Sequence, residues 1–226
     1  MAIAENTRAQ MREVLDQYPR KRSALMPLLH LVQADDGHIS REGLALVAEL
    51  TELSEAEVTA VSTFYTMYLK REGGRVRLGV CINSLCAVLG GDEIWESLVT
   101  YCGVGNNQTT EDGAVTLERI ECQAACTHAP VMTANWEFLD DMTVAKARQV
   151  VDDARAGRPI QSTRGPVVRS FEDAERTIAG VDDQLSLEGD HRDDRLLAGL
   201  RLAQQNGDAE RSAAAEREAA QRVRGS

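Results

Sequence analysis

Four cysteines in two close pairs constrain this chain more than any other feature of its sequence. Four residues separate Cys81 from Cys86, and three separate Cys122 from Cys126. Each pair follows a short segment in which apolar residues alternate with others, the pattern of a β-strand. Two strand ends that each present two thiolates can enclose a metal centre. We therefore interpret the rest of the chain as scaffold and docking surface for this site.

The composition limits the functions open to the chain. Its 226 residues suffice for one domain with an appendage or for two small domains. The net charge of −11 argues against binding to nucleic acid or to an anionic membrane surface, because both need a basic face. No apolar run approaches the roughly 20 residues of a membrane helix, and residues 1–6 lack the pattern of a secretory signal. We expect a cytoplasmic protein without direct membrane insertion.

In a reducing compartment the cysteines favour metal binding or redox chemistry, because disulfides are rare there. The fifth cysteine, Cys102, lies on a predicted helix away from both pairs, and we expect it to be a core thiol. His128 follows Cys126 by two residues. Since four cysteines already complete a four-ligand site, we expect His128 beside the site or at the surface and not as a ligand.

The order of predicted elements indicates an α+β protein in three parts. Residues 1–70 carry four segments of helical periodicity and predict an N-terminal helical bundle. Residues 71–160 have the order strand, helix, strand, strand, helix, which predicts a thioredoxin-like α/β domain with each cysteine pair just past a strand. Residues 161–226 are polar, and we expect a mostly irregular C-terminal tail, or one ordered only against a partner, with a short helix at 196–202.

Capping residues and turns set the expected boundaries within these parts. We expect helices to be capped at Ser23, Ser40, Asp92 and Thr143, and a capping box at Ser54 with Glu57. The expected strands are 75–81, 114–120 and 131–136, and 104–113 is expected to be a loop.

Residues 64–68 form an aromatic segment that holds three of the chain's seven Phe and Tyr residues. Such a segment is typical of a packing seam between two domains. It is also typical of a surface that binds a partner or shields a metal site, and the sequence leaves both interpretations open.

The cysteine spacing leaves more than one chemistry open. Four-cysteine zinc sites are common, and a redox dithiol usually has the spacing C-x-x-C, which neither pair matches. A [2Fe–2S] cluster takes two thiolates on each iron, so Cys81 and Cys86 would hold one iron and Cys122 and Cys126 the other. Gly90-Gly91 and other small residues would let backbone amides approach the sulfurs, which helps to set a cluster's reduction potential. Zinc and iron–sulfur both remain possible at this point.

Several motifs together resemble the NuoE family, the 24 kDa subunit of respiratory complex I, which is a thioredoxin-like [2Fe–2S] ferredoxin. The resemblance covers about residues 10–160. The matching motifs are the aromatic segment 64–68, the C-x4-C pair, Glu121-Cys122-x3-Cys126 and Ala129-Pro130. The resemblance implies that Cys81, Cys86, Cys122 and Cys126 bind one [2Fe–2S] cluster. Two features depart from it, namely Gln123-Ala124-Ala125 in place of a Leu-Gly-Ala-like filling, and a longer tail.

The resemblance further implies an electron-transfer subunit of an NADH:quinone oxidoreductase, with no complete active site on this chain. NADH and FMN would bind to a partner flavin subunit, other peripheral-arm subunits would be further partners, and the complex would lie at the cytoplasmic face of the plasma membrane. One alternative is a diaphorase subunit of a soluble NAD-dependent formate dehydrogenase or hydrogenase. Another is a zinc-stabilised interaction module without a redox role.

Overall fold

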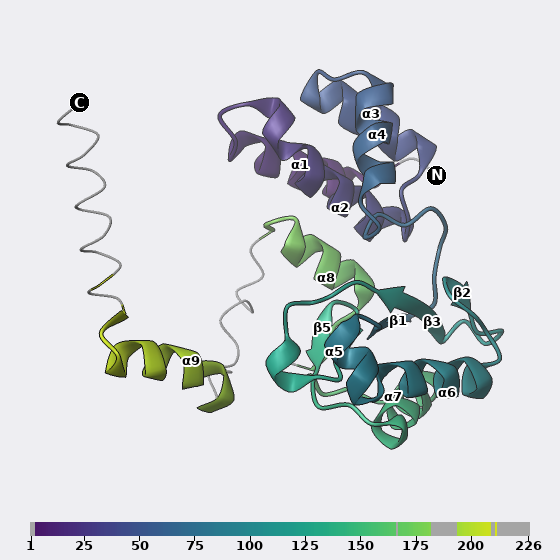
Figure 1. Cartoon of the computed structure of the whole chain (residues 1–226). Coiled ribbons are helices and arrows are strands. Elements are labelled where there is room, and N and C mark those ends of the chain that lie inside the picture. Colours follow the sequence, from purple (N-terminus) through teal and green to yellow (C-terminus); the bar gives the residue numbers. More distant parts are fainter. Residues whose placement is uncertain (1–2, 166, 182–193, 209–210, 212–226) are drawn as a thin grey trace. The chain divides into compact units, whose positions relative to one another are not determined.

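The computed structural model describes residues 3–165, 167–181, 194–208 and 211 (Figure 1). The chain forms two compact units, Met1–Gly189 and Asp190–Ser226. The first unit contains an N-terminal bundle of helices and a mixed sheet with its own helices. In the second unit the described helix is α9 (Asp194–Gln205), which confirms the helix expected at 196–202.

The N-terminal bundle is built around one helix that is apolar on nearly every side. Its four helices are α1 (Glu5–Asp16), α2 (Leu25–Asp36), α3 (Arg41–Thr51) and α4 (Glu55–Phe64). Eight of the twelve residues of α2 are buried, because the other helices and α8 surround it. The bundle core includes Met11 from α1, Leu28 and Leu29 from α2, Val47 from α3 and Val58 from α4. This core confirms the predicted bundle.

Most of the predicted caps of the bundle are present. Ser40 accepts a hydrogen bond from the amide of Gly43 at 2.9 Å, and Ser54 and Glu57 form the expected capping box. The prediction for Ser23 is wrong. Ser23 lies inside a 3₁₀ turn, η1 (Lys21–Ala24), which runs directly into α2, so that no side chain caps α2 at Ala24.

The sheet has five strands in the order β2-β3-β1-β4-β5. Strand β1 pairs parallel with β3 and antiparallel with β4, and the outer pairs are antiparallel. The strands are β1 (Val76–Cys81), β2 (Gln108–Thr109), β3 (Val115–Ile120), β4 (Met132–Ala134) and β5 (Glu137–Leu139). The strands β2 and β5 were not predicted. The segment 104–113 contains the short strand β2, and 131–136 is not one strand but leads into a β4–β5 hairpin that turns at Asn135 and Trp136.

Helices α6 (Asp92–Cys102) and α7 (Val144–Ala156) lie side by side on one face of the sheet (Figure 1). Leu78 and Val80 of β1 share a buried core with Leu98 of α6 and Val151 of α7. Helix α5 (Ser84–Cys86) is followed by the turn η2 (Ala87–Gly91), which leads into α6 across a kink at Gly90, where φ is 112°. Because the chain is already helical at Gly91, Asp92 begins α6 without capping it, and the predicted cap is wrong. Thr143 caps α7 as expected.

Helix α8 (Phe171–Ile178) lies between the bundle and the sheet (Figure 1). It packs on α2 and buries Ala174 and Glu175. This helix falls in the stretch that we expected to be mostly irregular. Ser170 caps the helix by accepting from the amide of Asp173, a local signal that the prediction missed, and its buried face carries a carboxylate, Glu175, whose partners lie far away in sequence. Residues 182–193, 209–210 and 212–226 of the predicted tail lie outside the described residues, and the domain boundaries at 70 and 160 stay predictions.

Candidate metal centre

Parallel pairing of β1 with β3 brings the two cysteine pairs together. In the register of this pair, Cys81 lies opposite Ile120. Both strands end at these residues, at the same edge of the sheet. The chain after β1 then carries Cys86 on α5, and the chain after β3 carries Cys122 and Cys126. All four predicted site residues therefore gather where two parallel strands end, the usual position of ligands in such sheets.

The sulfurs are arranged in two pairs. The Sγ atoms of Cys122 and Cys126 lie 3.8 Å apart. Two sulfurs on a tetrahedral metal with bonds of about 2.3 Å would have about this separation. Cys86 hydrogen-bonds to Cys81, and electrostatic interactions link Cys126 to both Cys122 and Cys81. Within the part of the chain that the structure describes, no three His, Cys, Asp or Glu side chains gather as one group for a single metal ion, so the four sulfurs form two pairs and not one compact cage.

The two pairs differ in burial. Cys81 and Cys86 are buried, whereas Cys122 and Cys126 are exposed. Burial raises the pKa of Cys86 to about 11, although a hydrogen bond from the amide of Val131 to its sulfur acts in the opposite direction. A hydrogen bond with Cys122, together with that residue's charge, raises the pKa of Cys126. Because burial disfavours the thiolate of Cys86, a metal that binds this residue must displace a proton.

The outer cysteine loop contains an unusual backbone conformation. Ala124 has φ of 55°, in the left-handed region that glycine adopts most easily. In this conformation its amide donates to the sulfur of Cys122 at 3.4 Å. The 3₁₀ turn η3 (Cys126–His128) follows, and the Ala129–Pro130 peptide bond is cis.

Gly91 lies against the backbone of both inner cysteines. A Cβ atom at this position would lie 2.8 Å from the carbonyl oxygens of both Cys81 and Cys86. The sequence suggested that small residues here admit amides to the sulfurs. The structure instead places Gly91 against two carbonyl groups. The turn η2 can therefore pack closely against the backbone of Cys81 and Cys86.

Cys102 and His128, which we did not expect to be ligands, each contact other parts of the domain. Cys102 ends α6, is half-buried and packs against the core between α6 and α7, where burial raises the pKa of its thiol. The side chain of His128 is buried, and its Nδ1 lies 3.3 Å from Oδ2 of Asp141. Its backbone joins the turn after Cys126, which places His128 beside the site.

Sequence reasoning missed two sets of polar partners. Asn83, between the inner cysteines, donates to the carboxylate of Glu121, which precedes the outer cysteines. Glu175 of α8 is fully buried and bonds to both His30 and Trp136. No sequence signal could have paired these residues, because 38, 145 and 39 positions separate the partners.

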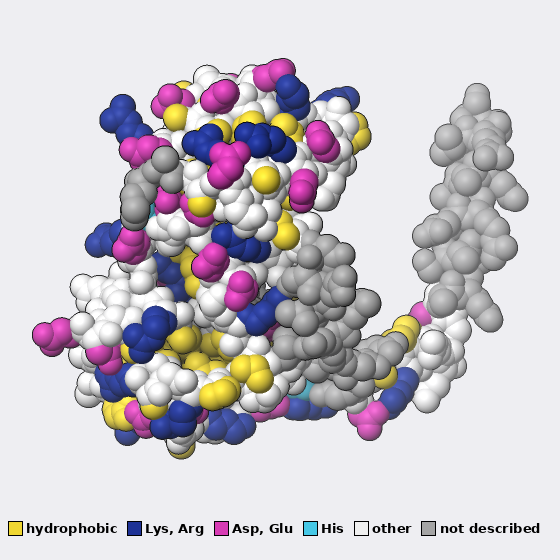
Figure 2. Space-filling model, turned by 180° about the vertical axis from the view of Figure 1, so that it is seen from behind, with side chains coloured by type: hydrophobic (Ala, Val, Ile, Leu, Met, Phe, Trp, Pro, Cys, Tyr) yellow, Lys and Arg dark blue, Asp and Glu magenta, His cyan; other side chains and the backbone are white. Residues whose placement is uncertain are grey.

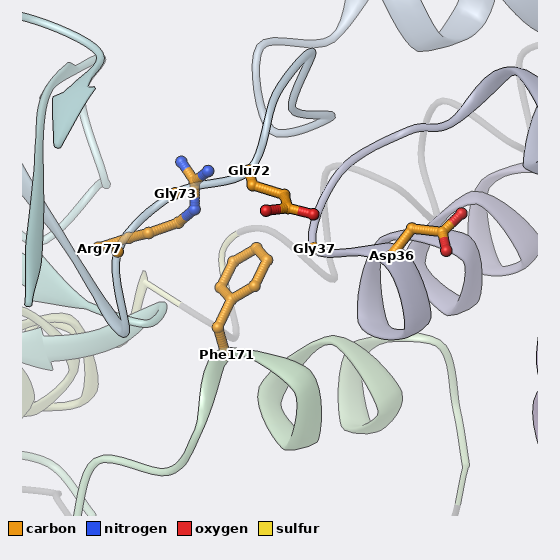
Figure 3. A pocket seen from close by; sticks show the side chains of 7 residues that line it. Asp36, Gly37, Glu72, Gly73, Arg77 and Phe171 are labelled. Atoms are coloured by element: carbon orange, nitrogen blue, oxygen red, sulfur yellow. The ribbon is translucent and has the colours of Figure 1, made fainter. Parts of the chain in front are cut away.

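A separate pocket of about 260 Å³ lies near the other end of β1. It is lined by Asp36 and Gly37, by 72–74, by Arg77 and by Phe171. Figure 3 shows the side chains of Glu72, Arg77 and Phe171 around it.

Arg77, in the wall of this pocket, stacks over the Phe171 ring and forms a buried ion pair with Glu118. Burial raises the pKa of Glu118 and lowers that of Arg77, while the ion pair opposes both shifts. The pocket thus belongs to the junction of bundle and sheet.

The model of one protein family, described as thioredoxin-like [2Fe–2S] ferredoxin, matches residues 11–155. The chain belongs to this family. Among its relatives is the E subunit of the NADH-quinone oxidoreductase of Mycobacterium tuberculosis, 47% identical over 196 residues, which are 86% of this chain and 78% of the relative. "NADH-quinone oxidoreductase subunit 2" of Thermus thermophilus is 31% identical over 69% of this chain and 88% of its own length. These relatives confirm the resemblance found in the sequence.

One solved structure shares the fold of this chain. The crystal structure of an NAD⁺-reducing [NiFe]-hydrogenase in the air-oxidized state matches 65% of this chain with a TM-score of 0.55 and 17% sequence identity. This chain covers 27% of that hydrogenase chain.

The residues of this family member fit a [2Fe–2S] group. The donor set consists of four cysteine sulfurs in two pairs, as two irons with two thiolates each require. Amides of Ala124 and Val131 donate to sulfurs of the two pairs, as is usual around such clusters.

Proposed function

We propose that this chain is an electron-transfer subunit of an NADH:quinone oxidoreductase and carries one [2Fe–2S] cluster. The observation that carries the proposal is the meeting of two cysteine pairs at the ends of paired parallel strands in a chain of this family. Cys81 and Cys86 hold one iron, and Cys122 and Cys126 hold the other. Such a cluster accepts and returns one electron at a time.

The inner and outer cysteine pairs have different roles in this proposal. The buried inner pair anchors the cluster in the fold and keeps water from it. The exposed outer pair brings the cluster to the surface, where a redox partner can approach closely. Amides at Ala124 and Val131 stabilise negative charge on the sulfurs and so favour the reduced state.

The partner that supplies electrons is a flavin subunit that binds NADH and FMN, and this chain has no complete active site of its own. The flavin receives a hydride and passes its electrons on singly, which a one-electron centre can accept. Other subunits of the peripheral arm are further partners, and the complex lies at the cytoplasmic face of the membrane. Within the described ranges, no helix combines the length and apolar character needed to cross a bilayer.

An exposed group of aliphatic side chains next to Cys86 gives a docking surface for the flavin subunit. This cluster-side patch consists of Leu85, Val88 and Leu89, and Val88 is 82% exposed. Contact with an apolar face would remove water between donor and acceptor, and it would bury area that favours association.

The aromatic segment 64–68 provides a second contact. Its Tyr68 is buried in the bundle core, as a packing seam requires, whereas Phe64 is 78% exposed and stacks edge-on against Tyr65 at 5.0 Å. Both interpretations of the segment therefore have support from different residues, and we assign Phe64 to partner binding.

The charges on the visible surface are consistent with protein partners. Figure 2 shows Lys and Arg interspersed with Asp and Glu, so that this face of the molecule presents no large basic area. Nucleic acid, which requires a basic face, is not a partner in this proposal.

The experiment that tests the proposal is electron paramagnetic resonance of the purified, dithionite-reduced chain, with iron, sulfide and zinc quantified in the same sample. We expect one S = 1/2 signal and about two irons per chain. Cys81→Ser and Cys122→Ser should lose or destabilise the signal, whereas the matched control Cys102→Ser should keep it. About one zinc per chain without a signal would replace electron transfer with the zinc-stabilised module.

A soluble diaphorase is distinguished by its electron acceptor. A complex purified through this chain should reduce a quinone with NADH. Reduction of NAD⁺ by hydrogen or formate in that complex would assign the chain to the alternative.

A further inference from the structure

The outer half of the proposed cluster site is held less firmly than the inner half. Cys81 and Cys86 are 2% and 3% exposed and pack with Ala125 and Val131, whereas Cys122 and Cys126 are at the surface. Two bonds in the outer loop are local. The amide of Ala124 donates to Cys122, and the side chain of Gln123 donates to the carbonyl of Glu121. These hydrogen bonds shape the loop but do not reach the inner cysteines, so the loop is attached to the inner pair mainly by the packing of Ala125, which lies between Cys122 and Cys126.

The backbone connection between the two cysteine segments weakens just before the site. The register of β1 with β3 ends at Cys81 and Ile120. One further backbone bond, from the amide of Ile82 to the carbonyl of Ile120, is already 3.5 Å long. At a length of 3.5 Å such a bond is weak.

Beyond this backbone bond, one side-chain hydrogen bond joins the two cysteine segments. Nδ2 of Asn83 donates to Oε2 of Glu121 at 3.1 Å. Asn83 lies between the two inner cysteines, and Glu121 directly precedes Cys122. The bond therefore ties the loop that carries the inner pair to the loop that carries the outer pair. It also holds a carboxylate next to an outer cysteine, although nothing about the chemistry of a four-cysteine site requires a carboxylate there.

We propose that Asn83 and Glu121 form a latch that keeps the outer cysteine loop closed on the cluster, and that the carboxylate held by the latch lowers the cluster's reduction potential. This inference rests on the proposed function. Asn83 and Glu121 are positioning residues, because the ligands are the four cysteines.

Two separate physical effects follow from this arrangement. Opening of the exposed loop admits water and chelators to the iron held by Cys122 and Cys126, so each bond that opposes opening slows cluster loss. A fixed negative charge next to the cluster disfavours an additional electron, so its removal raises the potential. Because the first effect needs the bond and the second needs the charge, different substitutions separate them.

Three variants of the loaded, full-length chain test the latch. Asn83→Ala removes the bond and keeps the charge, Glu121→Gln keeps an acceptor oxygen for Asn83 and removes the charge, and Glu121→Ala removes both. Cluster loss is measured as bleaching of the visible absorbance in excess chelator, and the potential is measured in a dye-mediated titration. Glu111→Gln is the matched control, because this exposed carboxylate precedes the far end of β3, whose six residues span about 20 Å.

We expect Asn83→Ala and Glu121→Ala to bleach about three-fold to ten-fold faster than the wild-type chain, the range that one hydrogen bond of ordinary strength gives. Glu121→Gln should bleach at close to the wild-type rate. Both Glu121 variants should have a raised potential, whereas Asn83→Ala and Glu111→Gln should differ little from the wild type.

Two results would overturn the proposal. Wild-type bleaching rates in both Asn83→Ala and Glu121→Ala would show that the bond does not secure the loop. Equal shifts of the potential in Glu121→Gln and Glu111→Gln would show that only net charge matters. If the wild-type chain contains zinc and no iron, the proposed function fails separately, and the same variants test the latch through the rate of zinc release.

Discussion

At the scale of single residues, Gly91 is a position beside the proposed cluster site that leaves no room for a side chain. Its Cα faces the carbonyl oxygens of both inner cysteines, and neither oxygen can move without moving a proposed ligand. An added methyl group 2.8 Å from two backbone atoms must displace at least one of the two cysteines.

Gly91→Ala should therefore lower the free energy of unfolding by about 1–3 kcal/mol, the usual cost of overpacking, and reduce the iron content per chain. Chemical denaturation and iron analysis measure the two effects. Gly105→Ala is the control, because its new Cβ would meet Gln108 at 3.4 Å, an ordinary contact. Full iron content in Gly91→Ala would contradict the tight approach.

Ala124 holds a left-handed backbone conformation that is unfavourable for alanine. The resemblance leads one to expect a glycine-containing filling in this part of the sequence. The structure shows what this departure costs in conformational terms. The loop needs a left-handed residue at 124 to aim an amide at the sulfur of Cys122, and alanine adopts that conformation at a cost of about 1 kcal/mol.

At the scale of elements, α8 joins the two halves of the first compact unit. Its Glu175 is fully buried and accepts from Nε1 of Trp136, in the β4–β5 hairpin, at 2.6 Å. The other carboxylate oxygen lies 2.6 Å from Nδ1 of His30, in the central helix of the bundle. Phe171 of the same helix lies against Trp136 and Arg77 on the sheet side.

Glu175→Ala should destabilise the chain by about 2–4 kcal/mol, because it leaves a buried histidine nitrogen and a partly buried indole nitrogen without their partner. Urea unfolding measures the loss, and hydrogen exchange should rise in both α2 and the hairpin. Glu172→Ala on the same helix is the control, since its exposed ion pair with Arg176 contributes at most about 0.5 kcal/mol. Exchange that rises in α8 alone would contradict a joining role.

A pair of truncations gives an independent form of the same test. A chain that ends at residue 181 keeps α8 and should retain the wild-type stability of the first unit. A chain that ends at residue 166 loses α8 and should behave like Glu175→Ala or worse. Equal stability of the two truncated chains would assign no stabilising role to the helix.

At the scale of the whole molecule, the proposed partner surface is apolar and lies next to the site. Val88→Glu places a charge on the most exposed side chain of the cluster-side patch. It should weaken binding of the flavin subunit by about ten-fold or more, while the cluster spectrum stays unchanged. Calorimetry or a quantitative pull-down with the purified flavin subunit measures the affinity.

Val167→Glu is the matched control for that experiment, because Val167 is also an exposed valine, at 44%, but lies outside the patch. Unchanged affinity in Val88→Glu, or equal weakening in both variants, would move the docking surface elsewhere.

The sequence by itself determined the features that depend on nearby residues. Alternation over 75–81 and 114–120 predicted β1 and β3, and hydroxyl caps at Ser40, Ser54 and Thr143 predicted helix starts. Each of these signals works over a few residues, through side-chain periodicity or a bond to a neighbouring amide. The four cysteines and their order were predictable for the same reason.

Only the tertiary structure decided which residues meet across long separations. Parallel pairing of β1 with β3 set Cys81 beside Ile120, burial divided the cysteines into an inner and an outer pair, and Asn83 met Glu121. Helix α8 has a local start signal, because Ser170 caps it as Ser40 caps α3, but only the tertiary structure brought its Glu175 to partners on two other elements. Burial and long-range pairing arise from the packing of the entire chain, and no local pattern encodes them.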